Sequence, residues 1–260
     1  DEDGLATLRG LIAESDVVIQ NMRPGLVEKL GVDADAVCAA NPRLIYCSLG
    51  AFGNTGPMAA DVGYDPLLQA FSGIMSVTGE AERPPVRVGP SIIDMGSGMW
   101  CVIGILAALT RRSATGRGCK VDTSLFETGL AWMNIPIANA MSSGRAPGRS
   151  GSETPMLAPY KAFRAKDRFI VIAAGNDNLF ARLCKVLGRE EWIADPRYAR
   201  NQDRVANRAA LNQQVEEIVA SKDAQVWVDA LRAVSVPCAP LQDANEVIAH
   251  AQTEALGMLQ

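Results

Sequence analysis

Residues 91 to 118, which read SIIDMGSGMWCVIGILAALTRRSATGRG, are the stretch that most constrains how this chain can fold. Asp94 stands just before a group of small residues, an apolar block runs from Met99 to Leu109, and a pair of arginines precedes Gly116. Acidic residues favour the first turn of a helix, basic residues favour the last turn, and glycine favours the position just past the end. The stretch therefore predicts one long helix.

The apolar block has no polar face, which predicts a helix buried in a large core. A membrane span is not expected, because roughly ten to twelve apolar residues fall short of the ~20 that a bilayer requires. The 260-residue chain is 48% hydrophobic and 21% charged, a composition typical of a globular protein with one large or two modest domains.

Asp94 has two interpretations at this point. Aspartate is a preferred N-cap residue, whose carboxylate accepts hydrogen bonds from free backbone N–H groups of the first helical turn. Alternatively, a helix N-terminus keeps a carboxylate ionised, and the nearby glycines let a large ligand approach the backbone, so Asp94 could act as a covalent nucleophile. The residue pattern alone does not choose between the two.

Charge and cysteine usage exclude several classes of function. The net charge of −4 argues against a general nucleic-acid-binding protein. The six cysteines, at 38, 47, 101, 119, 184 and 238, form no C-x-x-C pair, which indicates reduced thiols and a cytoplasmic location. His250 is the one histidine, so a multi-histidine metal site is impossible and no metal is expected.

The first half of the chain alternates short apolar strands with short helices. The expected strands are 16–20, 44–49 and 120–125, and the expected helices are 5–14, 26–30, 33–40, 67–76 and a stretch 127–141 broken by Pro136, with an exposed loop at 79–88. Strands of continuous hydrophobicity indicate a parallel sheet covered on both faces. Ligands bind at the carboxyl ends of such strands, here Gln20 to Met22 and Ser48 to Pro57.

Composition changes at Ser142 to Pro155 (SSGRAPGRSGSETP), which predicts a linker. We expect a large α/β domain at 1–141, Rossmann-like, a linker at 142–158 and a smaller α+β domain at 159–240. The smaller domain should contain a hairpin of 160–163 with 169–174, helices at 179–187, 202–221 and 224–233, and a proline-bounded segment at 237–240.

An ordered set of short phrases resembles one known family. The phrases are NMRPG at 21–25, NPRLIYCS at 41–48, FGNTGP at 52–57, GYD at 63–65, GILAAL at 104–109, TGRG at 115–118, APY at 158–160, IAAGND at 172–177 and NQDRVANR at 201–208. Together they resemble the class III coenzyme A transferases, which include formyl-CoA and carnitine CoA transferases and, as a divergent branch, α-methylacyl-CoA racemase. The resemblance extends over nearly the whole chain.

The resemblance implies a catalytic role for Asp94, which stands where the family has an aspartate at the start of the helix before GILAAL. Its implied role is to attack the thioester of an acyl-CoA and to carry a covalent aspartyl intermediate. Coenzyme A would be a substrate, and no permanently bound cofactor is implied. A small carboxylic acid would be the other partner.

Further site residues follow from the resemblance. Asn21 matches a residue along the pantetheine and adenosine part of CoA, and Met22 stands where the family usually has an aromatic residue. Lys29 stands where relatives have a basic residue near the CoA phosphates; otherwise it is a solvated helix lysine. Tyr64 is expected to approach the acyl or carboxylate group, and Asp65 to orient the site.

Alternatives to CoA transfer are racemisation or isomerisation of an acyl-CoA, and a catalytically silent fragment that dimerises or binds CoA. The racemase branch has a histidine at the position of Tyr64, and a phenol of pKa ~10 replaces an imidazole of pKa ~6.5 poorly, which favours transfer. The resemblance also implies an interlocked homodimer. Relative to the family, we expect a first strand and helices before Asp1 and a return segment that starts at 241–260 and continues beyond Gln260.

Overall fold

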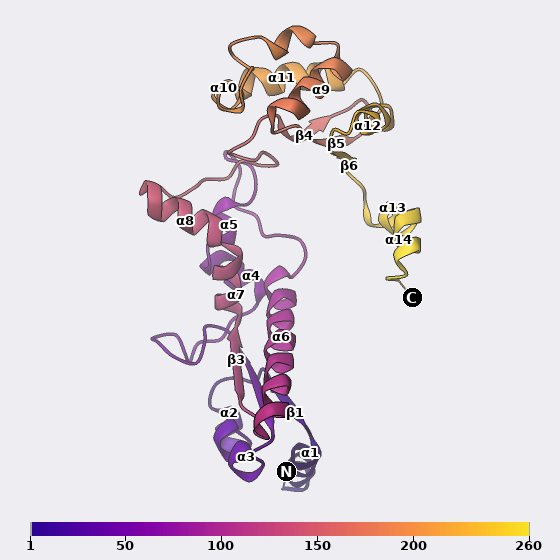
Figure 1. Cartoon of the computed structure of the whole chain (residues 1–260). Helices are drawn as coiled ribbons and strands as arrows, with labels where there is room; N and C mark the ends of the chain where they lie inside the picture. Colours follow the sequence, from indigo (N-terminus) through magenta and orange to yellow (C-terminus); the bar gives the residue numbers. More distant parts are fainter. Residues whose placement is uncertain (1, 260) are drawn as a thin grey trace. The chain divides into compact units, whose positions relative to one another are not determined.

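The computed structural model describes residues 2 to 259. The chain divides into two compact units, Asp1–Arg149 and Ser150–Gln260, and the boundary falls inside the predicted linker 142–158. Unit 1 contains a parallel sheet with helices and unit 2 an antiparallel sheet with helices (Figure 1). The predicted fold class, an α/β unit followed by an α+β unit, is confirmed.

The sheet of unit 1 has the strand order β1 (Val17–Gln20), β2 (Ile45–Gly50) and β3 (Lys120–Ser124), all parallel. Its helices are α1 (Glu2–Glu14), α2 (Leu26–Leu30), α3 (Ala34–Ala40), α4 (Asp65–Phe71), α5 (Ile74–Val77), α6 (Ile92–Thr115), α7 (Leu125–Trp132) and α8 (Asn134–Ser143).

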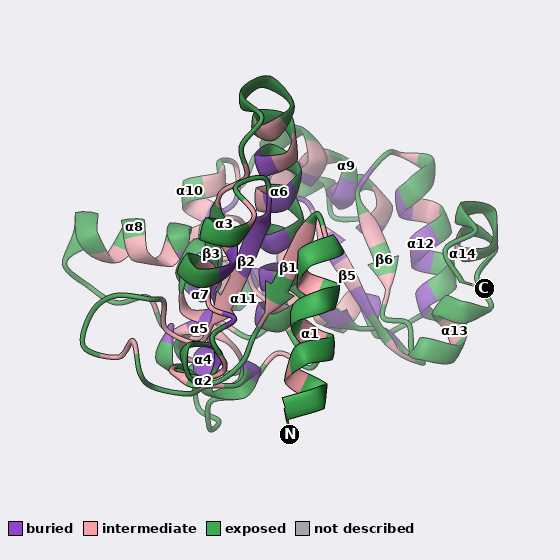
Figure 2. Cartoon of the chain, turned by 90° about the horizontal axis from the view of Figure 1, so that it is seen from below, coloured by how far each residue is buried: buried purple, intermediate pink, exposed green. Residues whose placement is uncertain are grey.

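Helices cover both faces of this sheet, as predicted. On one face, Leu44 and Tyr46 pack with apolar residues of α1, α2 and α3. On the other, Ile45 and Cys47 pack against Cys101 and further residues of α6. Figure 2 shows β2 as a buried strand and α1 as largely exposed. Strand β2 therefore carries the centre of the core.

Helix α6 begins after Ser91 and ends at Gly116, whose φ of 72° is the left-handed conformation that glycine adopts most easily. Its buried side packs closely on β3, because a Cβ atom at Gly104 would lie 2.5 Å from Cγ1 of Val121. The prediction of one long helix with signalled ends is confirmed.

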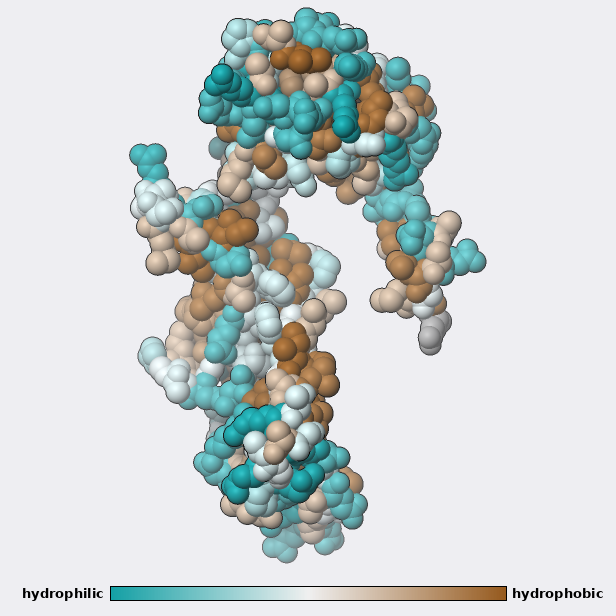
Figure 3. Space-filling view, viewed as in Figure 1, coloured by the Kyte–Doolittle hydropathy of each residue, from teal (hydrophilic) through white to brown (hydrophobic). Residues whose placement is uncertain are grey.

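The prediction that α6 is buried all round is wrong. Its outer side carries an exposed apolar stripe, which consists of Met95, Met99, Val102, Ile103 and Leu106. These residues recur at the spacing of one helical face. Figure 3 shows a hydrophobic area over α6. The described residues of unit 1 pack against the face of α6 opposite this stripe and leave the stripe uncovered.

The length argument against a membrane span was also wrong, because α6 has 24 residues. By length and composition it is the one described helix able to cross a membrane, with a mean hydropathy of 1.8. The core helix of a globular protein passes the same test, and α6 packs through Cys101, Ile105 and Ala108 onto the sheet.

Two predicted helices are interrupted. The helix expected at 67–76 is α4 and α5, separated at Gly73, whose φ of 90° is incompatible with a continuous helix. The stretch 127–141 breaks at Met133 and not at Pro136. Pro136 lies in the first turn of α8, where the N–H group that proline lacks has no partner within the helix.

Unit 2 contains an antiparallel sheet of β4 (Tyr160–Arg164), β5 (Phe169–Ala173) and β6 (Cys238–Pro240), with β5 in the centre. The other elements are α9 (Asp177–Leu187), a 3-10 helix (Glu190–Ile193), α10 (Asn201–Ala206), α11 (Arg208–Val219), α12 (Ala224–Ala233), α13 (Ala244–Ile248) and α14 (Ala251–Leu256). The predicted hairpin is confirmed, the helix expected at 202–221 is divided at Asn207, and the proline-bounded segment is a strand.

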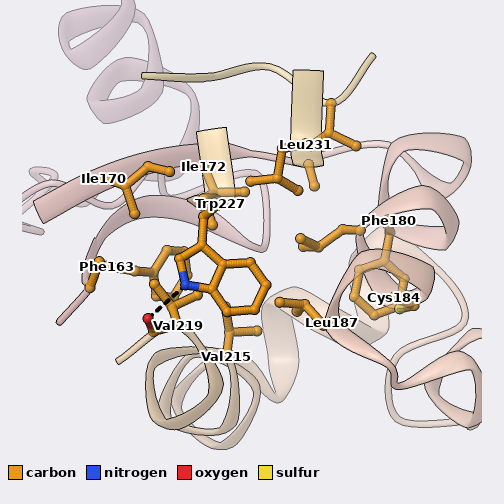
Figure 4. Packing of buried hydrophobic residues seen from close by; sticks show 14 of the residues in the cluster. Phe163, Ile170, Ile172, Phe180, Cys184, Leu187, Val215, Val219, Trp227 and Leu231 are labelled. Carbon is orange, nitrogen blue, oxygen red and sulfur yellow. Dashed lines mark hydrogen bonds between the residues drawn. The ribbon is translucent and has the colours of Figure 1, made fainter. Parts of the chain in front are cut away.

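The core of unit 2 forms around Trp227 (Figure 4). The indole Nε1 donates to the Val219 carbonyl at 2.8 Å, so this buried ring has its polar atom satisfied. Residues 153–158, predicted as linker, are held to unit 2: Nδ2 of Asn201 donates to the Met156 carbonyl at 2.9 Å, and Nη1 of Arg208 donates to that of Thr154 at 3.4 Å.

Candidate active site

A cleft of about 870 Å³ lies at the carboxyl end of the unit 1 sheet. Gln20, Ser48 and Asp122 are register partners on adjacent strands, and all three line it. Parallel strands bring their carboxyl ends to one edge, so residues far apart in sequence meet there. This is the edge at which the sequence predicts a ligand.

Four of the six predicted site residues line this cleft: Asn21, Met22, Tyr64 and Asp94. Asn21 and Met22 follow β1 directly, Tyr64 precedes α4, and Asp94 lies in the first turn of α6. Lys29 does not line the cleft, although its neighbours Val27 and Glu28 on α2 do. Asp65 lies behind the cleft wall and is only 1% exposed.

The interpretation of Asp94 as the helix cap is wrong. The N-cap residue is Ser91, and the Asp94 side chain forms no hydrogen bond or ion pair with the residues described. The cap is supplied from another element, because Oδ2 of Asp65 accepts from the N–H groups of Ile93 at 2.8 Å and of Asp94 at 3.2 Å. The Asp94 carboxylate is therefore free to face the cleft.

Burial raises the pKa of the Asp94 carboxyl group above the usual value for aspartate, and the negative charge of Asp65 raises it further. Asp94 as a residue is exposed, so water still reaches the group. The carboxylate form is consequently more basic than that of an ordinary aspartate.

The glycines near Asp94 do not act as one group. A Cβ atom at Gly96 would lie 2.8 Å from the ring of Trp132 and 2.9 Å from Cγ2 of Thr128, so this glycine permits close packing of α6 on α7. Around Gly98, in contrast, no described atom lies within 4 Å of that position, apart from its chain neighbours and the backbone of its own helix. Only Gly98 leaves open space of the kind expected for a ligand.

Tyr64 is 68% exposed at the cleft, so its ring is not a core residue. Its backbone carbonyl accepts from the N–H of Leu68 and thereby starts α4, which places its side chain at the cleft wall. The histidine of the chain, His250, caps α14 in unit 2 and does not line the cleft.

Sequence reasoning missed the charged residues of the cleft. Arg23 and Lys120 line it, and Lys120 is ion-paired with Asp35. Asp122 accepts from Nδ2 of Asn54 at 2.7 Å, which ties β3 to the loop after β2. Alternation along β3 places Lys120 and Asp122 on one face, but the strand order that opens this face to a cleft is not readable from the sequence.

Comparison with known proteins identifies the family of this chain. The family model described as CoA-transferase family III matches residues 1–260. An acetyl-CoA:oxalate CoA-transferase of Acetobacter aceti is 40% identical over 100% of this chain, and an acyl-CoA transferase of Fusarium pseudograminearum is 39% identical over 99%. The crystal structure of a CaiB/BaiF family protein from Brucella suis covers 99% of the chain with a TM-score of 0.88 and 39% identity.

The chain belongs to the CoA-transferase family III. It spans 67% of the length of the Acetobacter relative, 56% of the Fusarium relative and 68% of the Brucella chain. The resemblance seen in the short phrases is thus confirmed over the full chain.

Proposed function

We propose that this chain transfers coenzyme A from an acyl-CoA to a carboxylic acid through a covalent intermediate on Asp94. The observation that carries the proposal is the Asp94 carboxylate itself: it lies at the cleft, has no partner among the described side chains, and has a raised pKa. A residue that only stabilised the helix would instead bond to the free N–H groups, as Asp65 does.

The proposed first step is attack of an Asp94 oxygen on the thioester carbonyl carbon. The C–S bond breaks, CoA leaves as a thiolate, and a mixed anhydride remains. The thiolate then attacks the aspartyl carbonyl, releasing the donor acid as a carboxylate and forming an aspartyl-CoA thioester. Each step exchanges one acyl bond for another, which divides a difficult exchange into easier ones.

The acceptor carboxylate next attacks the aspartyl thioester and again expels CoA thiolate, which leaves a second anhydride. Attack of the thiolate on the acceptor's carbonyl carbon yields the new acyl-CoA and restores the Asp94 carboxylate. Electrons and atoms balance without an oxidant or a metal. Tyr64 is suitably exposed at the cleft to donate a hydrogen bond to the reacting acyl or carboxylate oxygens.

For CoA itself, the proposal uses the cleft wall after β1, where Asn21 and Met22 lie. Arg23 and Lys120 are the cations of the cleft and are better placed for phosphate groups than Lys29, which lies outside it. Guanidinium and ammonium groups both bind phosphate, the former with two donors.

The test is to trap the intermediate. We expect that incubation with acetyl-CoA, followed by hydroxylamine, converts Asp94 into a hydroxamate, because hydroxylamine cleaves anhydrides and thioesters. Mass spectrometry of the peptide that contains Asp94 detects the product, and oxalate serves as the acceptor probe, after the Acetobacter relative. Exchange of the acyl α-proton in deuterium oxide, with no adduct, would favour isomerisation instead.

We also propose that two copies associate, as the family resemblance implies. The exposed stripe of α6 supports association, since contiguous apolar surface is a mark of protein–protein contact.

We expect sedimentation analysis to give the mass of two chains, and Leu106→Glu to shift the population towards one chain, because a charge would be buried in the interface. Leu106 is 57% exposed, so folding should be little affected. Val226→Glu, on a similarly exposed position of α12, is the control. A single-chain mass for the unaltered protein would contradict the proposal.

A further inference from the structure

Gln69 is a fully buried polar side chain. Both the nitrogen and the oxygen of its amide group form hydrogen bonds. Its Nε2 donates to Oδ1 of Asp65 at 2.6 Å and to the Val88 carbonyl at 3.5 Å, and its Oε1 accepts from the N–H of Val88 at 2.8 Å. A buried amide is costly unless its donors and acceptors are satisfied, so this arrangement holds both neighbours in place.

The Asp65 carboxylate bonds in two directions. Oδ1 accepts from Gln69 and Oδ2 from the backbone of Ile93 and Asp94. Each of these partners is an N–H donor, which fits a carboxylate held in one orientation. Gln69 is the one described side chain that bonds to Asp65, and it holds Oδ1 while the backbone of α6 holds Oδ2.

The other side of Gln69 reaches the loop between α5 and α6. Val88 lies near the end of this loop. Near its start the loop is held by Arg149, which donates to the carbonyls of Glu80, Ala81 and Arg83 at 2.9 to 3.1 Å. The loop predicted as simply exposed is therefore anchored twice, and one anchor leads through Gln69 and Asp65 to the turn that carries Asp94.

We propose that Gln69 is a positioning residue for Asp94: it orients Asp65, which fixes the first turn of α6, and it couples that turn to the loop through Val88. The inference rests on the proposed function, because it concerns the placement of the proposed nucleophile. Small errors in the position of a reacting group reduce catalysis strongly.

Other charges near the cleft define the background for any pH measurement. Besides Asp65 behind the wall, the titratable side chains lining the cleft with Asp94 are Arg23, Glu28, Asp33, Asp35, Tyr46, Asp61, Tyr64, Lys120 and Asp122. Of all these, only Asp65 contributes a charge effect to the raised pKa of Asp94. Loosening the turn should therefore weaken that repulsion and admit water, so the pKa of Asp94 should fall.

The first test is Gln69→Met, which keeps the volume and removes all three hydrogen bonds of the Gln69 amide group. We expect kcat for acetyl-CoA and oxalate to fall about 10- to 100-fold with KM nearly unchanged. Carboxyl ¹³C NMR of the chain without substrate should show a lower pKa for Asp94, assigned by comparison with Asp94→Asn. Asn212→Leu, which removes a buried amide in unit 2, controls for general destabilisation.

The second test is Gln69→Glu. In its neutral form the introduced carboxyl group can still donate one proton to Asp65 and accept from Val88, whereas in its ionised form it repels Asp65. We expect the ratio of kcat for Gln69→Glu to kcat for the unaltered protein to fall as pH rises. Circular dichroism at each pH checks that the variant stays folded.

An unchanged kcat and an unchanged Asp94 titration in folded Gln69→Met would overturn the inference, as would a pH-independent ratio for Gln69→Glu. Absence of the hydroxamate in the unaltered protein would instead overturn the proposed function, so the two failures are distinguishable.

Discussion

Replacing Asp94 with asparagine is expected to lower CoA transfer by at least about 10³-fold and to abolish the hydroxylamine-trapped product. An amide cannot attack the thioester, and no other carboxylate of the cleft lies in the first turn of α6. The free energy of unfolding should change by less than about 1 kcal/mol, because the exposed side chain caps nothing. Transfer assays and urea unfolding measure the two effects.

Asn176→Ala provides the converse control. Oδ1 of Asn176 caps α9 by accepting from the N–H of Leu179 at 2.8 Å, so its loss should cost about 1 kcal/mol of stability and leave the adduct intact. If Asp94→Asn were as destabilising as Asn176→Ala while still forming the adduct, Asp94 would be a structural residue after all.

The raised pKa of Asp94 fixes the sign of the pH effects. Transfer requires the ionised form, so the acid limb of the rate profile should lie above the usual pKa of aspartate. The effect of pH on stability has the opposite sign to that of a salt-bridged carboxylate. An acid whose pKa is raised in the folded state lowers the free energy of unfolding once the pH exceeds its pKa in the unfolded state. Asp94→Asn should therefore be neutral or slightly stabilising at higher pH.

Local signals were sufficient for much of the fold. The acidic start, basic last turn and glycine stop of α6 lie in consecutive residues, so the helix could be predicted with its ends. The apolar strands and short helices before residue 50 followed for the same reason. The breaks at Gly73 and Met133 were not foreseen, because they depend on how the chain packs and not on proline alone.

The covering of α6 could not be predicted from its own residues. An apolar helix indicates that something covers each face, but not which element does so. In the described chain, Cys101 and Ile105 meet the sheet while Met99 and Leu106 remain exposed. Whether a residue is buried depends on which elements pack against it. The sequence of the helix indicates that such elements are needed but does not identify them.

The cleft was predictable in part. Asn21 and Met22 follow a strand directly, so their place at the sheet edge follows from the chain order. Lys120 required the strand order as well. Asp65 and Gln69 carried an unused local signal, because residues four apart on a helix are neighbours and a Gln–Asp pair at that spacing hydrogen-bonds.

In unit 2, Arg204→Met is expected to lower the free energy of unfolding by roughly 3 to 5 kcal/mol. The guanidinium is fully buried and lies 4.5 Å from the centre of the Phe180 ring. It donates to the carbonyls of Ala158 at 2.7 Å and Tyr198 at 2.9 Å. Methionine would leave these buried acceptors without a donor. It would also remove the hydrogen bonds by which Arg204 joins Ala158 to Gly175.

Urea unfolding followed by tryptophan fluorescence measures this effect, because Trp192 and Trp227 are both buried in unit 2. Asp177→Asn is the matched control. Asp177 pairs with Arg204 at 2.8 Å, but its own side chain is 60% exposed, so breaking the ion pair from that side should cost less than about 1 kcal/mol. Equal losses from the two variants would mean that the ion pair, and not the buried carbonyl contacts, accounts for the stabilisation by Arg204.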